Sequence, residues 1–326
     1  MININFEKFS TFYHNNIEPQ LIDLEKERKK CILSFRILDF IYILFIILFI
    51  GFPIFPIFLP FDSFLINHYE IVVFSIFIPI IIGFPLYIYS QQKQKQYIRK
   101  LKLKVYTKLF KIIGLEYKQG AFPEFADYQN AVLNYCQNNE FLEVFYIMHF
   151  EDGISGIFMN IPFAFADTGI IKKWVDNKHD STIFKGLMLA VKLNKNFDKE
   201  TVIKTDNFKL FDIKKNIIKL EDEEFNKKFK VLADDEVEAR YLLTTSFMER
   251  LKNFHKNKKD KTIIFFDNKC SESKNMFILT NTGKDNFEIP LNKTLLNEKI
   301  YYNLLKELVD MLEIAVALKL EQNIGL

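Results

Sequence analysis

The chain has 326 residues, a net charge of +3 and 16% aromatic residues. A charge this small does not indicate nucleic-acid binding, and the length allows more than one compact unit. Cys31, Cys136 and Cys270 lie far apart, without a C-x-x-C motif or a nearby histidine. We therefore expect free thiols in a reducing compartment, and neither a metal site nor another cofactor.

Residues 1–36 are expected to form amphipathic helices in the cytosol. Apolar residues recur at helical spacing before Pro19, at Phe6, Phe9, Tyr13 and Ile17. A second apolar stripe continues from Leu21 to Phe35. The sequence therefore predicts two short helices that meet near Glu18–Pro19.

Two long uncharged runs follow, from Phe40 to Phe61 and from Ile71 to Tyr89. As helices rising about 1.5 Å per residue they would reach roughly 33 and 28 Å, close to the roughly 30 Å hydrocarbon core of a bilayer. Residues 37–90 are therefore predicted to form a two-helix transmembrane hairpin with a short external loop. The runs contain five prolines but no ionisable residue, which favours a plain anchor over a transport path.

Basic residues lie on the outer flank of each run. Residues 26–36 carry five Lys or Arg and residues 93–104 carry six, whereas the loop Asp62–Glu70 carries none. Short basic segments are retained on the cytoplasmic side of a membrane. We therefore expect a multi-pass plasma-membrane protein with both termini in the cytoplasm.

A basic juxtamembrane helix is predicted over residues 91–114, with Gly114 at its end. It is expected to pack on the helix of residues 20–36 through Leu24, Ile32, Leu101 and Val105. Six of its basic residues could hold anionic lipid headgroups: Lys93, Lys95, Arg99, Lys100, Lys102 and Lys104. The alternative is that they only set the membrane topology and keep one helix face in water.

Residues 115–326 are predicted to form a cytosolic α+β domain. After a helix over 126–137, the pattern changes to an antiparallel meander, with strands at 142–150, 154–161, 163–171 and 182–193. Turns are expected at Asp152–Gly153 and Asp167–Gly169. The run Ile183–Val191 is apolar on both faces, so it should lie centrally in the sheet.

The second half of this domain alternates short strands, at 201–204 and 217–220, with helices. The predicted helix starts are an acidic turn at Glu221–Glu224, a cap at Asp234 or Asp235, and a capping box of Ser246 with Glu249. A hairpin over 261–267 and 275–281 leads to a C-terminal helix capped by Thr294.

Several short motifs stand out in residues 115–326. The most specific is Val237-Glu238-Ala239-Arg240-Tyr241-Leu242-Leu243-Thr244 followed by Phe247-Met248-Glu249-Arg250-Leu251; shorter pieces are Asp152-x-x-x-Gly156, Phe163-x-Phe165, Phe184-x-Gly186 and Phe229-x-Val231. They resemble the bacterial membrane-protein family known as domain of unknown function 3137, apart from Thr245, where that family is expected to favour proline. The resemblance implies a bacterial inner-membrane location and supplies no activity.

Catalytic signatures are absent from the sequence: the five histidines fall in five different predicted elements, and no nucleophile motif or phosphate-binding glycine loop occurs. The weak catalytic candidates are Asp152, Glu238 and Arg240. Glu236 and Arg240 are spaced for an ion pair on a helix surface, which explains the carboxylates near Arg240 without chemistry. Gly156 and Gly186 are expected to allow close strand packing rather than to hold a phosphate. The sequence thus favours a protein without catalytic activity.

Two functions remain open. The first is a membrane-tethered cytosolic binding or scaffold module for an unidentified protein, lipid headgroup or small ligand. The second is a membrane-bound hydrolase or transferase acting near the bilayer. Carboxylates converging with Arg240 in a pocket would indicate chemistry, whereas Arg240 in solvent beside Glu236 would indicate the module.

Overall fold

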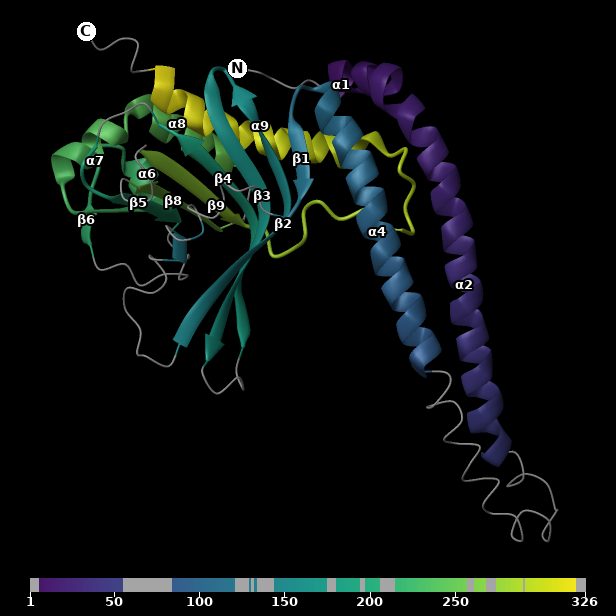
Figure 1. The fold of residues 1–326 in the computed structure, drawn as a ribbon. Helices are drawn as coiled ribbons and strands as arrows, with labels where there is room; N and C mark the ends of the chain where they lie inside the picture. The colour runs from purple at the N-terminus through teal and green to yellow at the C-terminus, as the bar shows by residue number, and fades with distance from the viewer. Residues whose placement is uncertain are drawn as a thin grey trace. The chain divides into compact units, whose positions relative to one another are not determined.

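The computed structural model describes residues 6–54, 84–120, 129, 132–133, 144–174, 180–193, 197–205, 215–256, 261–267, 274–289 and 291–320. The chain divides into two units. The sheet unit comprises residues 1–15, 106–288 and 298–326, and the hairpin unit comprises residues 16–105 and 289–297. Figure 1 shows the ribbon with its helices and strands labelled.

The chain begins with helix α1 (Phe6–Phe12) and a π-helical segment, Tyr13–Ile17. Helix α2 (Glu18–Ile54) follows directly. The predicted boundary near Glu18–Pro19 is therefore present, but the second helix is not short as predicted, because α2 continues to Ile54. Pro19 is tolerated there because a residue in the first turn of a helix needs no intrahelical N–H partner.

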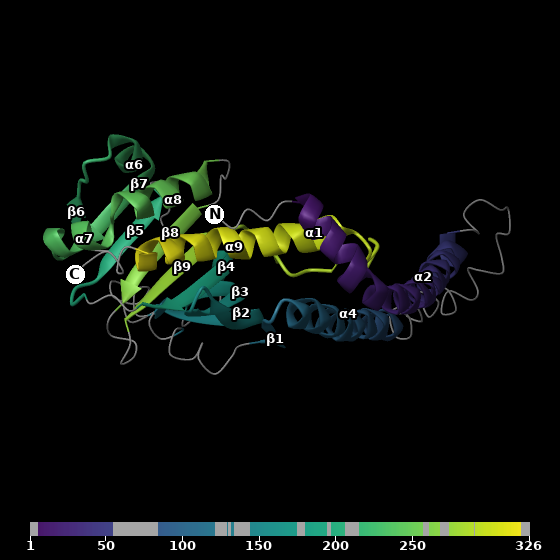
Figure 2. The same ribbon diagram turned by 90° about the horizontal axis from the view of Figure 1, so that it is seen from above.

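Helix α4 (Phe84–Ile112) lies beside α2 and antiparallel to it in the hairpin unit (Figures 1 and 2). Its end is the one the sequence predicts: Gly114 has a φ of 77°, and the Leu115 N–H donates to the Phe110 carbonyl at 2.9 Å. This hydrogen bond and the positive φ of Gly114 are features of a Schellman motif, in which glycine avoids the strain that a Cβ would cause.

None of the helices in the described residues has the length and apolarity that crossing a membrane requires. The predicted span 40–61 is described only to Ile54 and the span 71–89 only from Phe84; the rest of each span lies outside the described residues. The structure therefore does not support the predicted transmembrane hairpin.

The sheet unit confirms the α+β class. Its sheet has nine strands in the order β1-β2-β3-β4-β9-β8-β5-β7-β6, and neighbouring strands are antiparallel. The strands are β1 (Glu116–Gln119), β2 (Val144–Phe158), β3 (Ile161–Trp174), β4 (Ser181–Lys192), β5 (Thr201–Thr205), β6 (Asn216–Ile218), β7 (Phe229–Ala233), β8 (Lys261–Asp267) and β9 (Asn275–Asn281). Strand β4 lies between β3 and β9, so its predicted central position is confirmed.

The predicted turns at Asp152–Gly153 and Asp167–Gly169 are wrong. Asp152 lies within β2, next to a register shift after Phe150, and Asp167 lies within β3 as its cross-strand partner. The real turn is Met159–Asn160, with φ of 49° and 62°. Polar residues inside a buried strand carry the same sequence signal as a loop, because only their tertiary partners distinguish the two.

The helices of the sheet unit are α6 (Glu223–Lys228), α7 (Glu236–Leu242), α8 (Thr245–His255) and α9 (Glu298–Leu320). Asp222 caps α6 and Asp235 caps α7, the latter as predicted. Two predicted caps are wrong. Thr244, not Ser246, caps α8, since its hydroxyl accepts from the Phe247 N–H; and α9 begins four residues beyond Thr294.

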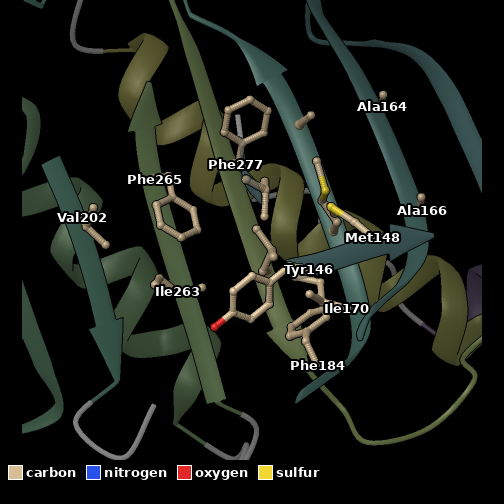
Figure 3. Packing of buried hydrophobic residues seen from close by; sticks show 14 of the residues in the cluster. Tyr146, Met148, Ala164, Ala166, Ile170, Phe184, Val202, Ile263, Phe265 and Phe277 are labelled. Atoms are coloured by element: carbon tan, nitrogen blue, oxygen red, sulfur yellow. The ribbon is translucent and has the colours of Figure 1, made fainter. Parts of the chain in front are cut away.

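A large part of the core lies on one face of the sheet. Its residues come from strands β2, β3, β4, β5, β7, β8 and β9 and include Tyr146, Phe184, Phe265 and Phe277. Figure 3 shows these side chains on one face, with helices behind the sheet on the other. Helices α8 and α9 pack on each other, and α9 contacts β4. The sheet is thus buried on both faces, which explains why residues 187–191 of β4 are all apolar and buried.

Candidate functional site

The three predicted catalytic candidates lie on two elements and contact different partners. Asp152 is on β2, whereas Glu238 and Arg240 are on α7. Among the described residues, no group of three or more His, Cys, Asp or Glu could hold a metal ion. Each of the three side chains has its own set of contacts, described in turn below.

Arg240 is held by surface groups. Its guanidinium pairs with Glu221, lies 2.7 Å from Glu236, and donates to the Lys219 carbonyl at 2.9 Å. The predicted pair of Glu236 with Arg240 is therefore present. These contacts fasten α7 to the segment before α6, and they leave the guanidinium facing acceptors from its own chain.

Glu238 accepts two consecutive backbone N–H groups, from Asp198 at 2.5 Å and from Lys199 at 2.7 Å. A carboxylate that accepts two backbone N–H groups supplies the hydrogen-bond acceptors that these groups need where the chain has no regular secondary structure. Its role is to hold the chain before β5 against α7, and the sequence offers no signal for this contact because the partners are 39 and 40 residues away.

A buried carboxylate pair lies between β2 and β3. Asp152 and Asp167 are directly opposite each other in the register, and both are almost fully buried. The Tyr117 hydroxyl of β1 donates to Asp152, and burial with this carboxylate raises the pKa of Tyr117. Asp167 accepts the Asn286 N–H at 2.6 Å and the Asn286 side-chain amide at 3.3 Å. The pair therefore anchors β1 and the loop after β9 to strands β2 and β3.

Burial raises the pKa of Asp167 to about 6 from 3.8, although the Asn286 hydrogen bonds oppose the shift. The folded-state pKa is the higher one, so this carboxyl contributes stability that is complete below about pH 4 and is lost as the pH rises through 6. We expect a loss of up to about 3 kcal/mol between pH 4 and pH 7.

Asp167→Asn removes the titration and retains an oxygen that accepts from Asn286. The pH dependence of the difference in unfolding free energy between the wild type and this variant, from chemical denaturation, measures the effect. Asp285→Asn is the matched control, because Asp285 pairs with Lys185 at 2.7 Å near the same network and is only partly buried. Parallel pH curves for the wild type and Asp167→Asn would contradict the assignment.

In the hairpin unit, four side-chain contacts fix the register of α2 against α4. The Phe35 ring packs edge-on against the Tyr97 ring, with 6.2 Å between the ring centroids, and the Tyr42 ring stacks on the Tyr87 ring, with 5.1 Å between the centroids. Lys104 lies 3.4 Å from Glu27, and Ser90 donates to Asp39 at 3.3 Å. Of the four residues predicted to pack here, Leu24, Leu101 and Val105 are buried and Ile32 is half-buried.

The outer faces of these two helices are apolar near the uncharged runs. Large exposed apolar side chains on α2 are Leu33, Ile37, Leu38, Phe40, Ile41, Ile43, Leu44 and Ile47, and on α4 they are Phe84, Tyr87, Ile88 and Tyr89. Contiguous apolar surface of this extent on a protein marks an interaction site. Of the basic residues predicted to face lipid, Lys93, Lys95, Arg99, Lys100 and Lys104 are exposed, whereas Lys102 is buried.

A buried ion pair inside the hairpin unit joins two residues three apart on α2, a spacing that allows such a pair on a helix. Arg28 lies 2.6 Å from Glu25, and both are buried. Arg28 also donates to the Leu291 carbonyl, and Glu25 accepts the Leu295 N–H at 2.9 Å. Burial alone would raise the pKa of Glu25, but the hydrogen bonds from Arg28 and Leu295 outweigh it, so this pKa lies below its usual value. The pair fastens residues 289–297 to α2.

Fold and contacts thus define an α+β domain with a nine-stranded antiparallel sheet, attached to a helical hairpin. Residues 182–320 match the family model described as "Protein of unknown function (DUF3137)", which is the family that the sequence motifs resemble. The match does not extend to residues 115–181, where two of the shorter motifs lie.

No curated protein matches the chain. One similar solved structure is the crystal structure of the mycobacterial trehalose monomycolate transport factor A, TtfA, at 8% sequence identity and a TM-score of 0.32. The alignment covers 64% of this chain and 92% of that one. A TM-score this low does not establish a shared fold.

Proposed function

We propose that this chain is a membrane-tethered binding or scaffold module of the bacterial inner membrane. Its hairpin unit inserts through residues 40–61 and 71–89, both termini are cytoplasmic, and the sheet unit binds a cytosolic partner. The observation that carries the proposal is the row of exposed apolar side chains on α2 and α4, which leads into both uncharged runs. Such surface is unfavourable in water and favourable in lipid.

The register of the two helices supports the same arrangement. The interhelical contacts pair Glu27 with Lys104, Phe35 with Tyr97, Asp39 with Ser90 and Tyr42 with Tyr87. The midpoint of every pair falls at residues 64–66 in the sequence. This position is within the predicted external loop, Asp62–Glu70, which carries no Lys or Arg. A hairpin that continued in this register would therefore turn where the charge pattern places the far side of the membrane.

The alternative, a membrane-bound hydrolase or transferase, has less support. Arg240 lies beside Glu236 and Glu221 at the surface, and Asp152 belongs to a separate buried network with Tyr117. A catalytic group needs a reacting atom within reach of its partners. The contacts of Arg240, Glu238 and Asp152 are instead those of residues that fasten loops and strands.

Extraction of membranes with alkaline carbonate tests the proposal. The full chain should stay in the membrane fraction, and a reporter fused after Leu326 should be active in the cytoplasm. Replacing Ile43 and Ile47 with Lys puts two charges into the cytoplasmic half of the first run, where each costs up to about 2.5–3.5 kcal/mol, the figure for a helix centre, so this variant should be extracted more readily than the wild type. Ile217→Lys, at an exposed apolar position in the sheet unit, is the control and should stay in the membrane. Extraction of the wild type, or a reporter active only in the periplasm, would refute the proposal.

A further inference from the structure

The loop after β9, residues 282–288, closes over one of the two buried carboxylates, and we call it the cover loop. Asn286 lies in its middle. The Asn286 N–H donates to one oxygen of Asp167 at 2.6 Å, and the Asn286 side-chain amide donates to the other oxygen at 3.3 Å. Because the loop bonds both oxygens of an almost fully buried carboxylate, hydration of Asp167 requires the loop to move.

Further contacts hold the cover loop near each of its ends. At one end, the Gly283 N–H donates to the Lys185 carbonyl at 2.9 Å, and the Lys185 ammonium lies 2.7 Å from Asp285. At the other end, the Tyr106 hydroxyl donates to the Phe287 carbonyl at 3.0 Å. The buried Phe287 ring packs edge-on against the Tyr106 ring, with 5.6 Å between the centroids. The loop is thus fastened at both ends, with the bonds to Asp167 between them.

Charged and titratable groups surround Asp167 on every element packed near it. They are Asp152, Glu151 and His149 on β2, Tyr117 on β1, Tyr106 on α4, Tyr301 on α9, Lys185 on β4, and Asp285 and Glu288 in the cover loop. Asp285 and Glu151 disfavour a negative charge on Asp167, whereas the Lys185 ammonium and the Asn286 hydrogen bonds favour it. Burial disfavours the charge more than any of these groups does.

Closure of the loop and protonation of Asp167 therefore favour each other. Burial raises the pKa of Asp167 to about 6 from 3.8 in the closed arrangement. When the loop opens, the carboxyl regains water and its pKa returns toward the usual value. The closed loop thus binds the proton more tightly than the open loop does. By linkage, opening is suppressed at low pH and becomes easier as the pH rises through 6.

We infer that residues 282–288 form a proton-dependent cover, which is locked over the buried carboxylates when the pH falls and loosens as the pH rises toward neutrality. The two pKa values of Asp167 imply that the equilibrium constant for opening increases about tenfold between pH 5 and pH 7. This device is additional to the proposed membrane tethering and does not depend on it, since all the groups involved belong to the sheet unit.

Hydrogen exchange of the full chain in detergent, followed by mass spectrometry at several values between pH 5 and pH 7, measures the opening once the intrinsic pH dependence of exchange is removed. Protection of the cover-loop amides, which include Gly283 and Asn286, should fall about tenfold over this range. At every pH it should be lower than the protection of the β9 amides. Low concentrations of urea should accelerate exchange in β9 but not in the loop, because local opening exposes little surface.

Three variants test which group binds the proton. Asp167→Asn should make loop protection independent of pH. His149→Gln is the control and should keep the tenfold change, since histidine side chains in general also change charge in this range. Asn286→Ala removes a hydrogen bond that favours the charged form of Asp167, so the midpoint of the pH dependence should move to higher pH.

Loop protection that is constant with pH in the wild type overturns the inference, and so does a tenfold change that persists in Asp167→Asn. Equal acceleration of the loop and β9 by urea would show that the loop opens only when the whole unit unfolds, which also overturns it. If Asp167→Asn does not fold, Asn286→Ala decides: an upward shift of its midpoint supports the assignment to Asp167, and an unchanged midpoint refutes it.

Discussion

Replacing Arg28 with alanine should destabilise the attachment of residues 289–297 to α2 by about 3–5 kcal/mol. This is the usual cost of removing one partner from a buried ion pair, because the remaining charge, here on Glu25, is left without compensation. The Leu291 carbonyl also loses its donor. The readout is the rate of trypsin cleavage after Lys293, an exposed residue in this segment. An increase of about 100-fold or more is expected if cleavage follows local opening.

The matched control is Lys26→Ala. Lys26 also pairs with an acid on α2, but the Lys26 and Asp23 side chains are 69% and 87% exposed. An exposed pair contributes about 0–1 kcal/mol, so cleavage after Lys293 should change by less than about fivefold. The double variant Glu25→Gln with Arg28→Met removes both charges and should be cleaved more slowly than Arg28→Ala. Similar cleavage of Arg28→Ala and Lys26→Ala would show that the buried pair does not hold this segment.

Replacing Gly186 with alanine should destabilise the sheet by about 3 kcal/mol or more, since the change forces backbone apart at its centre. A Cβ at this position would lie 2.1 Å from the Thr280 carbonyl oxygen and 2.8 Å from the Thr282 nitrogen. Both atoms are backbone, of β9 itself and of the residue that directly follows it, so β4 and the end of β9 would have to separate. Chemical denaturation of the full chain, followed by the fluorescence of Trp174 on β3, measures the loss.

Gly156→Ala is the matched control for Gly186→Ala. A Cβ at Gly156 would lie 2.4 Å from Leu115 Cδ2, the end of a flexible side chain that can change rotamer. We expect a loss of about 1 kcal/mol or less there. The close neighbours of both glycines agree with the predicted role in close packing rather than in phosphate binding. Equal destabilisation by the two substitutions would contradict the distinction between a backbone clash and a side-chain clash.

Elements with a strong local signal were predictable from the sequence. The hairpin of β8 and β9 has the predicted bounds, because each strand is a short apolar run flanked by polar residues. Gly114 ends α4 and Asp235 begins α7 for equally local reasons, the positive φ of one and the capping carboxylate of the other. The motif around Val237–Leu251 also led to the family whose model matches residues 182–320.

Predictions failed where a polar residue has a distant partner. Asp152 and Asp167 were interpreted as turn residues, yet each lies in a strand, with Tyr117 and Asn286 as partners. Thr244 rather than Ser246 caps α8, although both are small hydroxyl residues near the break between two helices. In each case several local interpretations have similar energies, and the choice among them is made by burial and by contacts far away in the sequence.

Sequence by itself determined the periodicities, the uncharged runs and the excess of basic residues beside them, because these are properties of neighbouring residues. Tertiary structure decided which charges are compensated. Glu25 meets Arg28 and Leu295, Glu27 meets Lys104, and Asp39 meets Ser90, so these three acids each have a partner. Pairing depends on distance in space, and the Glu25 carboxylate and the distant Leu295 backbone N–H come together only when the chain has folded.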